Sequence, residues 1–226
     1  MEFDSFVLVA ATDSLHSVDG ARQHADAIEF RMDLSETPRK QLESYDGELP
    51  ILATNRWTAE GGTAEDDADR LAMLEWAIEQ PAVAAIDVEF GALDDPDWRS
   101  LVADARAGGV RVVVSLHDFD RTPSKAVMNE QLHEAGKHGD CAKLAVTATD
   151  RRDVLDLLSV TETRTAAGET VATMAMGAVG QHSRAVAPLY GSRIGYAPVA
   201  PDDATAPGQY TLETLSQLVR ALSVDH

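Results

Sequence analysis

GVRVVVSLHDFDRTPSKAVMNEQLHEAGKHGDCAKLAVTA, residues 109–148, contains one full unit of the pattern that decides the fold. Its ends, residues 109–119 and 141–148, are short apolar runs next to turn-forming residues, which is typical of buried strands. The segment between them, residues 124–137, has the length and composition of a surface helix. A strand, a helix and a second strand in this order indicate two parallel strands joined by a helical crossover.

The same alternation runs along the whole chain. We expect strands at residues 6–12, 28–33, 50–55, 83–90, 109–119, 141–148, 170–177 and 192–199. We expect helices at residues 17–27, 36–45, 66–80, 97–107, 124–137, 150–162, 182–190 and 211–223, with Asp150 capping the sixth. Eight such units without a Pro/Gly-rich linker predict an α/β protein, a single (β/α)8 TIM barrel over residues 1–226. The alternative is an open doubly wound sheet, but residues 10–20, AATDSLHSVDG, lack its Gly-rich phosphate loop.

The charge of the chain excludes two classes of partner. Asp and Glu total 38 against 19 Lys and Arg, giving a net charge of −19. We therefore expect neither nucleic acid nor an anionic membrane to bind by bulk attraction. The acidic residues are dispersed and lysine is scarce, which is typical of cytoplasmic proteins from salt-loaded cells. We predict a halophilic, cytoplasmic protein.

The melting temperature should rise when KCl is increased from low to molar concentration. Unscreened carboxylates repel one another and destabilise the compact state, and salt screens that repulsion. Thermal unfolding at a series of KCl concentrations measures the effect. Melting curves that do not change with KCl would contradict the halophilic interpretation.

Other simple features exclude further classes. Cys141 is the single cysteine, so no internal disulfide and no cysteine metal cluster can form. No apolar run approaches the roughly 18 residues that a membrane-spanning helix needs. The first residues, MEFDSFVLVAATDS, have no basic segment before the apolar stretch, so a signal peptide is not expected.

Charged residues gather where the second and third expected strands end, which is where a barrel carries its active site. Glu29, Arg31 and Asp33 are spaced by two and share one strand face. A closed barrel has no exposed strand edge, so three charges on one face favour a polar site over a solvated strand. Arg56 follows the third strand, and Glu60 lies four residues later in the loop.

Asp87 and Glu89 share one face at the end of the fourth strand. They could ligate a metal ion, but no second cluster with metal-site spacing accompanies them. A structural ion-pair network is an equally good interpretation. We predict that the protein needs neither a metal nor a cofactor.

His117 and Lys143 are the two residues that suggest catalysis. His117 lies at the tip of the fifth strand and is the only histidine on an expected strand, and histidine suits proton transfer near neutral pH. Lys143 lies within the apolar sixth strand, where a lysine is either paired with a carboxylate or used as an amine nucleophile. Poor solvation and cationic neighbours would favour its free amine. Such an amine condenses with a ketone to a Schiff base, which assists proton abstraction next to the carbonyl.

The loops after the last two strands add polar groups. Ser183 is expected to cap a short helix, and Arg184 begins that helix beside the barrel mouth, where it could hold a carboxylate. Thr205 and Gln209 lie in residues 197–210, a long loop that could cover the site as a lid.

Seven of these stretches, in this order, resemble the type I 3-dehydroquinate dehydratases of the shikimate pathway. They are EFRMD (29–33), TNRWTAEGG (54–62), DVEF (87–90), SLHDF (115–119), AKLAV (142–146), MGAVGQHSR (176–184) and APGQ (206–209). They cover nearly the whole chain, and seven in register on consecutive strands are highly specific. The resemblance implies a (β/α)8 barrel, a homodimer, and a lyase (hydro-lyase) that needs no metal.

The resemblance also implies roles for individual residues. Lys143 corresponds to the Schiff-base lysine and His117 to the general acid/base, with Glu60 or Glu29 orienting His117. Substrate-binding positions are Glu29, Phe30, Arg31, Arg56, Arg184, Thr205 and Gln209, with Arg184 on the substrate carboxylate. Thr205 stands where many relatives have serine and keeps the hydroxyl. The implied reaction converts 3-dehydroquinate to 3-dehydroshikimate through an imine.

Two other classes of function compete with this interpretation. A class I aldolase would also use a barrel lysine, but it usually needs a phosphate site after strands seven and eight. Arginines at three separate strand ends better suit a carboxylated, hydroxylated ring. A non-catalytic, carboxylate-binding barrel would form no covalent adduct, so borohydride reduction in the presence of 3-dehydroquinate separates the alternatives.

Overall fold

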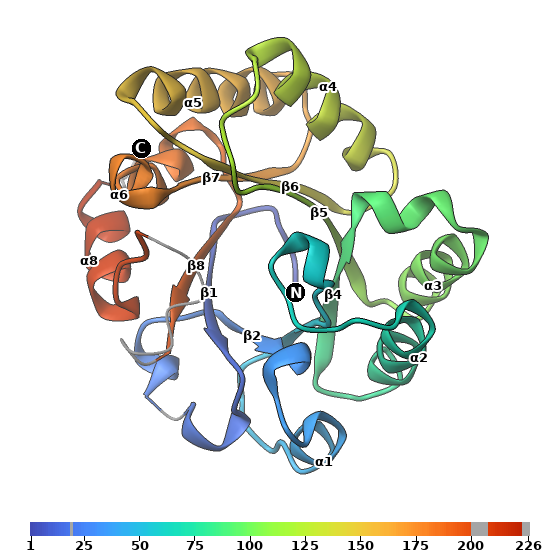
Figure 1. Ribbon diagram of the computed structural model, residues 1–226. Coiled ribbons are helices and arrows are strands. Elements are labelled where there is room, and N and C mark those ends of the chain that lie inside the picture. The colour runs from blue at the N-terminus through green and yellow to red at the C-terminus, as the bar shows by residue number, and fades with distance from the viewer. Residues whose placement is uncertain (19, 200–207, 223–226) are drawn as a thin grey trace.

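The structure, a computed structural model, describes residues 1–18, 20–199 and 208–222. In these residues eight strands form one sheet in the order β7-β6-β5-β4-β3-β2-β1-β8, with every recorded ladder parallel. The strands are Val7–Thr12 (β1), Ala27–Arg31 (β2), Ile51–Thr54 (β3), Val83–Glu89 (β4), Arg111–Asp118 (β5), Cys141–Thr147 (β6), Val171–Met176 (β7) and Ile194–Pro198 (β8). Neighbours follow chain order and curve round one axis (Figure 1), which confirms the (β/α)8 barrel over the open sheet.

The barrel nearly closes between β7 and β8. The backbone N–H of Arg193 donates to the Val171 carbonyl at 2.8 Å, and Val171 and Ser192 form an isolated parallel bridge. The N–H of Thr173 donates to the Ser192 hydroxyl at 3.0 Å. A side chain thus replaces one backbone partner where the two strands separate.

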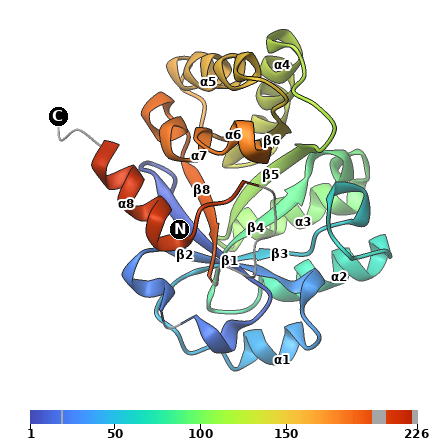
Figure 2. The ribbon, with the colours of Figure 1, turned by 60° about the vertical axis from the view of Figure 1, so that its left-hand side comes forward.

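The helices lie outside the strands (Figures 1 and 2). They are Pro38–Glu43 (α1), Asp67–Ala77 (α2), Pro96–Ala107 (α3), Lys125–Gly136 (α4), Arg151–Ala166 (α5), Gly177–Gly180 (α6), Ser183–Val186 (α7) and Leu212–Leu222 (α8). The Asp150 side chain accepts from the N–H groups of Arg152 and Asp153 and completes a capping box, which confirms the predicted start of α5. The helix continues to Ala166, four residues beyond its expected end.

Two of the expected helices, residues 17–27 and 182–190, are not continuous α-helices in the structure. Residues 17–27 contain the end of one 3-10 turn, Leu15–Ser17, and all of another, Ala21–Gln23. Gly20 disfavours a helix there, and the flanking pieces are too short for a stable α-helical nucleus.

Residues 182–190 form α7 and a 3-10 turn, Ala187–Tyr190, because Pro188 cannot continue the α-helical hydrogen bonds. Ser183 is not the N-cap as predicted: His182 holds that position, and the Ser183 hydroxyl accepts from the Ala175 N–H at 2.8 Å.

Alternation along the strands divides the core into two layers. One side chain in two points outward to the helices and joins a large cluster that includes Trp98 and Phe30. The others point into the barrel, where Phe3, Val113 and Cys141 belong to a separate interior cluster. Cys141 is buried beside other apolar groups. The polar side chains described next lie on this inward face.

In the part of the chain that the structure describes, no helix is both long and apolar enough to cross a bilayer.

Candidate active site

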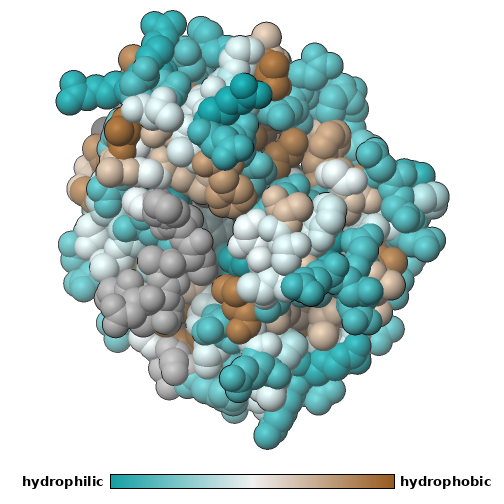
Figure 3. Space-filling view, in the orientation of Figure 1, coloured by the Kyte–Doolittle hydropathy of each residue, from teal (hydrophilic) through white to brown (hydrophobic). Residues whose placement is uncertain are grey.

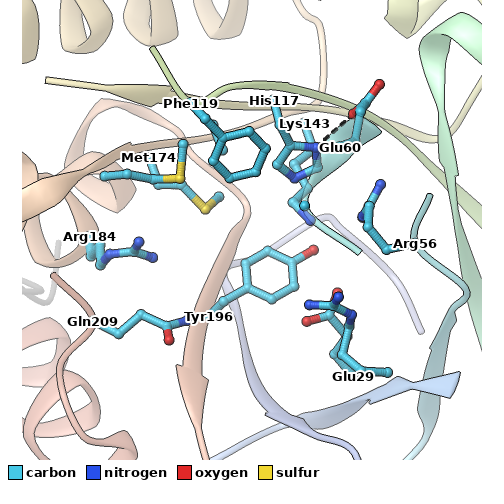
Figure 4. Close-up of a pocket in the computed structure, with 14 residues that line it drawn as sticks. Glu29, Arg56, Glu60, His117, Phe119, Lys143, Met174, Arg184, Tyr196 and Gln209 are labelled. Atoms are coloured by element: carbon cyan, nitrogen blue, oxygen red, sulfur yellow. Dashed lines mark hydrogen bonds and ion pairs between the residues drawn. The ribbon is translucent and has the colours of Figure 1, made fainter. Parts of the chain in front are cut away.

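One pocket opens at the C-terminal ends of the strands, and the surface is hollowed there (Figure 3). Its empty space is about 560 Å³ including the mouth, a size typical of small-molecule sites. The lining residues are Glu29, Arg31, Arg56, Glu60, Gly61, His117, Phe119, Lys143, Ala145, Met174, Met176, Arg184, Tyr196 and Gln209 (Figure 4). The sequence-predicted charged residues therefore meet in one place.

Lys143 points into this pocket from the middle of β6 and is 5% exposed. Its Nζ donates to Asp87 Oδ2 at 3.0 Å and lies 4.4 Å from the centroid of the Tyr196 ring. The amine thus has a carboxylate within hydrogen-bonding distance, in addition to the cationic side chains that line the same pocket. The predicted ion pair and the predicted position in a pocket are thus both present at one residue.

Asp87 is the centre of the buried charge network. Its Oδ1 accepts from Arg56 Nη2 at 2.8 Å and from the Ser115 hydroxyl at 2.6 Å, while Oδ2 faces Lys143. Burial alone would raise the pKa of this carboxyl, but Arg56, Lys143 and Ser115 together hold the pKa well below its usual range. Asp87 therefore stays ionised and gives any cation on Lys143 a fixed counter-charge.

Glu89 continues the network away from the pocket. Its Oε1 accepts from the Trp57 N–H at 2.9 Å, and its Oε2 accepts from Arg70, which is 1% exposed and also contacts Asp67. These contacts fix the loop after β3, which carries Arg56. Asp87 forms ion pairs with Arg56 and Lys143, and Glu89 forms one with Arg70. Among residues 1–18, 20–199 and 208–222 no group of three or more His, Cys, Asp or Glu side chains is placed to hold a metal ion.

His117 and Glu60 form the second chemical unit of the pocket. His117 Nδ1 and Glu60 Oε2 are 2.8 Å apart (Figure 4), so of the two candidates left open by the sequence, Glu60 is the carboxylate on the imidazole. Burial, with Arg56 and Lys143 nearby, keeps the pKa of His117 well below its ordinary value. Burial also raises the pKa of Glu60 to about 7. At neutral pH the imidazole is therefore an uncharged base whose Nε2 can face a substrate.

Phe119 and Gly61 hold this pair in place. The Phe119 ring stacks on His117 with centroids 5.9 Å apart and an interplanar angle of 11°. A Cβ on Gly61 would lie 2.6 Å from the Phe119 ring, and Gly61 has φ of +79°, so both the space and the backbone require glycine. The loop that supplies Glu60 thus fits directly against the ring that packs on His117.

The second strand supplies Glu29 and Arg31, but not Phe30. Glu29 Oε1 accepts from the Thr54 hydroxyl at 3.0 Å, and Arg31 makes two hydrogen bonds to Asp33 at 2.9 and 2.7 Å. Alternation turns the Phe30 side chain outward into the helix-facing core, where it is fully buried and lines no part of the pocket. The expected place of Phe30 among the substrate-binding positions therefore finds no support in its side chain and rests on the motif alone.

Arg184 enters the pocket from α7 with an unsatisfied guanidinium. It is 4% exposed, its Nε has no hydrogen-bond partner, and it forms no ion pair with any residue that the structure describes. Burial without a counter-ion lowers its pKa to about 10. A buried guanidinium of this kind calls for an anionic ligand. Gln209 lines the pocket beside it (Figure 4), whereas Thr205 and most of the expected 197–210 lid lie outside the described residues.

Sequence reasoning missed the apolar and aromatic part of the lining. Met174 and Met176 alternate on β7 and both point inward, so the strand period alone could have identified them. Tyr196 occupies the matching inward face of β8. These side chains add an apolar and aromatic part to the lining of a pocket whose other groups are mostly charged.

The fold and the pocket together define a class: (β/α)8 barrel enzymes whose strand ends gather a buried lysine, a histidine and arginines in one pocket. The chain belongs to the type I 3-dehydroquinase family, whose model matches residues 6–226, which confirms the family expected from the motifs.

Relatives and solved structures agree with this membership. The chain is 54% identical over 228 residues to the 3-dehydroquinate dehydratase of Haloarcula marismortui, with 100% of both chains covered. It is 50% identical over 225 residues to that of Halobacterium salinarum, covering 98% of this chain and 100% of the relative. The crystal structure of the enzyme from Geobacillus kaustophilus HTA426 superposes with a TM-score of 0.86 at 26% identity, covering 97% and 91% of the two chains. The first two organisms are halophilic archaea, in keeping with the acidic composition.

Proposed function

We propose that the protein dehydrates 3-dehydroquinate to 3-dehydroshikimate, a step of the shikimate pathway, through an imine on Lys143. The observation that carries this function is the meeting of Lys143 with the His117–Glu60 pair in a pocket that also contains an unpaired buried arginine. An amine nucleophile, a neutral base and an anion-binding group are the three parts that such a reaction needs.

The first step joins Lys143 to the substrate. Attack requires an unprotonated amine, and neutral His117 lines the same pocket and can accept the ammonium proton. The carbonyl oxygen takes one proton from the attacking amine and one back from His117, and it leaves as water. This step gives a cationic iminium at Nζ and returns His117 to its neutral form. Asp87, 3.0 Å from Nζ and held ionised by Arg56, stabilises that charge.

His117 then performs the elimination. The iminium acidifies the neighbouring C–H, and the Nε2 of His117 accepts that proton to give an enamine. The enamine expels the C1 hydroxyl, which takes the same proton and leaves as water. Hydrolysis of the imine consumes one water, releases 3-dehydroshikimate and regenerates the amine.

The remaining polar groups position the ring. Arg184 holds the substrate carboxylate, because it is the buried cation without a protein counter-ion in the described chain. Glu29, Arg31, Arg56 and Gln209 line the same pocket and bind the ring hydroxyls. Thr205 belongs to this group by its motif position.

The value of kcat/KM should rise as pH increases through about 7, the pKa of Glu60. Ionised Glu60 accepts from His117 Nδ1–H and leaves the Nε2 lone pair free for the substrate proton. Protonated Glu60 instead donates to Nδ1, which places the hydrogen on Nε2 and blocks the base. Glu60→Gln should lower kcat and remove this limb of the pH profile, whereas Glu65→Gln, an exposed residue of the same loop, should keep it. An unchanged limb in Glu60→Gln would exclude Glu60 as its origin.

Two measurements with 3-dehydroquinate as the substrate test the function directly. The purified chain should generate the absorbance of the conjugated product, and borohydride added during turnover should leave a stable adduct that peptide mapping places on Lys143. An aldolase would form the adduct but release cleavage fragments, and a non-catalytic barrel would give neither signal. Absence of both signals under molar KCl would contradict the proposed function.

We further propose that residues 1–226 act as one catalytic domain in a cytoplasmic homodimer that does not bind nucleic acid. The family model extends over nearly the whole chain, and the net charge of −19 opposes association with polyanions. Sedimentation analysis in molar KCl measures the oligomeric state.

A further inference from the structure

Tyr196 lies inside the barrel where the mechanism assigns no role. It is on β8, is 4% exposed, and lines the pocket. Its ring lies against the Lys143 amine, with Nζ 4.4 Å from the ring centroid. Its hydroxyl is fully buried and has no hydrogen-bond partner among the described residues.

A buried hydroxyl without a partner is unfavourable, since it loses its hydrogen bonds to water and gains none. A phenylalanine would fill the same space and avoid that cost. The unpaired Tyr196 hydroxyl therefore destabilises the protein without a ligand. A hydrogen bond to a ligand oxygen would remove this unfavourable free energy.

The position of the hydroxyl limits which ligand oxygen it can reach. Figure 4 shows it directed into the pocket between Lys143, Arg56 and Glu29. Burial, together with Glu29 and Asp87, keeps the pKa of this phenol well above its ordinary value, so it remains a hydrogen-bond donor. Arg56 is a donor without acceptor capacity. Glu29 accepts from Thr54 through Oε1, and no hydrogen bond joins its carboxylate to the Tyr196 hydroxyl.

We propose that Tyr196 is a further catalytic residue, whose hydroxyl donates to the oxygen on the carbon that Lys143 attacks and whose ring face stabilises the cation at Nζ. This assignment rests on the proposed function, because it concerns the formation and hydrolysis of the same imine. The hydroxyl keeps its proton throughout: it polarises the ketone, binds the hydroxyl of the carbinolamine, and releases it as water when His117 supplies the proton. The ring face remains in contact with the charged nitrogen.

The variant Tyr196→Phe separates the contribution of the hydroxyl donor from that of the ring face. The variant keeps the ring and loses the donor, so the rate of borohydride-trappable adduct formation and kcat/KM should both fall by about 10- to 100-fold. The melting temperature should stay equal or rise, because an unsatisfied buried group is removed. Tyr196→Leu also loses the ring face and should form the adduct more slowly still.

Rapid-quench trapping with borohydride, steady-state kinetics and thermal unfolding provide the readouts, all in molar KCl. Tyr190→Phe is the matched control, since Tyr190 is 42% exposed outside the pocket, and it should behave as wild type. Wild-type adduct formation in Tyr196→Phe would overturn the proposal, as would a loss of melting temperature that accompanies the loss of rate. If the wild-type chain itself forms no adduct, the proposed function fails instead, so the two failures are distinguishable.

Discussion

Lys143→Ala should lower kcat by at least about 10⁴-fold and abolish the borohydride adduct, because it removes the nucleophile on which every later step depends. The other three lysines, Lys40, Lys125 and Lys137, are not among the residues that line the pocket, so none can replace it. The fold should survive. Asp87 keeps Arg56 at 2.8 Å and Ser115 at 2.6 Å, so the substitution does not leave a buried carboxylate without a cation.

Mass spectrometry of the reduced protein and the product absorbance measure the two losses, while circular dichroism and the melting curve report the fold. Lys137→Ala is a suitable control, because Lys137 is half-exposed at the end of α4 and pairs only with Glu134. It should retain both adduct and turnover. Residual turnover in Lys143→Ala near the wild-type rate, or an adduct on another lysine, would contradict the assignment.

Most of the site could be predicted because barrel geometry converts strand position into spatial position. Lys143 and His117 are polar residues on the inward face of apolar strands, and the C-terminal ends of all eight strands meet at one mouth. Such residues are costly to bury, so their presence in the sequence already indicates a use. Strand register then brings together groups that are far apart in the chain, such as Ser115 and Lys143.

The parts that could not be predicted depend on side-chain direction and loop packing. Glu60 and Glu29 were both candidates for orienting His117, and the structure places Glu60 on the imidazole through the loop after β3, where Gly61 packs against the Phe119 ring. The Phe30 side chain was assigned to the site from its motif, although the strand period of two turns it away from Glu29 and Arg31.

Two further residues show why a sequence pattern does not predict which buried charges pair or which buried polar groups lack a partner. Lys143 Nζ on β6 lies 3.0 Å from Asp87 Oδ2 on β4, with β5 between the two strands. Strand order alone does not predict this ion pair. Tyr196 reads in sequence as an ordinary aromatic residue of a core strand. Its meaning comes from a hydroxyl that the surrounding protein leaves unpartnered.

His117→Ala should lower kcat by about 10²- to 10⁴-fold while the adduct on Lys143 still forms. The reason is that imine formation depends first on the Lys143 amine, whereas proton removal from carbon and return of the proton to the leaving hydroxyl both depend on the imidazole. The covalent intermediate should therefore accumulate before elimination. Borohydride trapping at early and late times, compared with product absorbance, separates slow chemistry from loss of binding.

His133 on α4 provides a matched control. Its Nδ1 lies 2.7 Å from Glu169 Oε1, much as His117 Nδ1 contacts Glu60, but the His133 side chain is 48% exposed. His133→Ala loses an exposed ion pair worth at most about 1 kcal/mol and should turn over as wild type. Added imidazole should restore part of the activity of His117→Ala and should not change that of His133→Ala. The reason is that His117→Ala leaves a cavity next to Glu60 where a free base can bind. Wild-type turnover in His117→Ala would remove His117 from the elimination step and assign the proton transfer to another group in the pocket. Complete loss of its adduct with the fold intact would also contradict the prediction, because it would place the main role of His117 in imine formation.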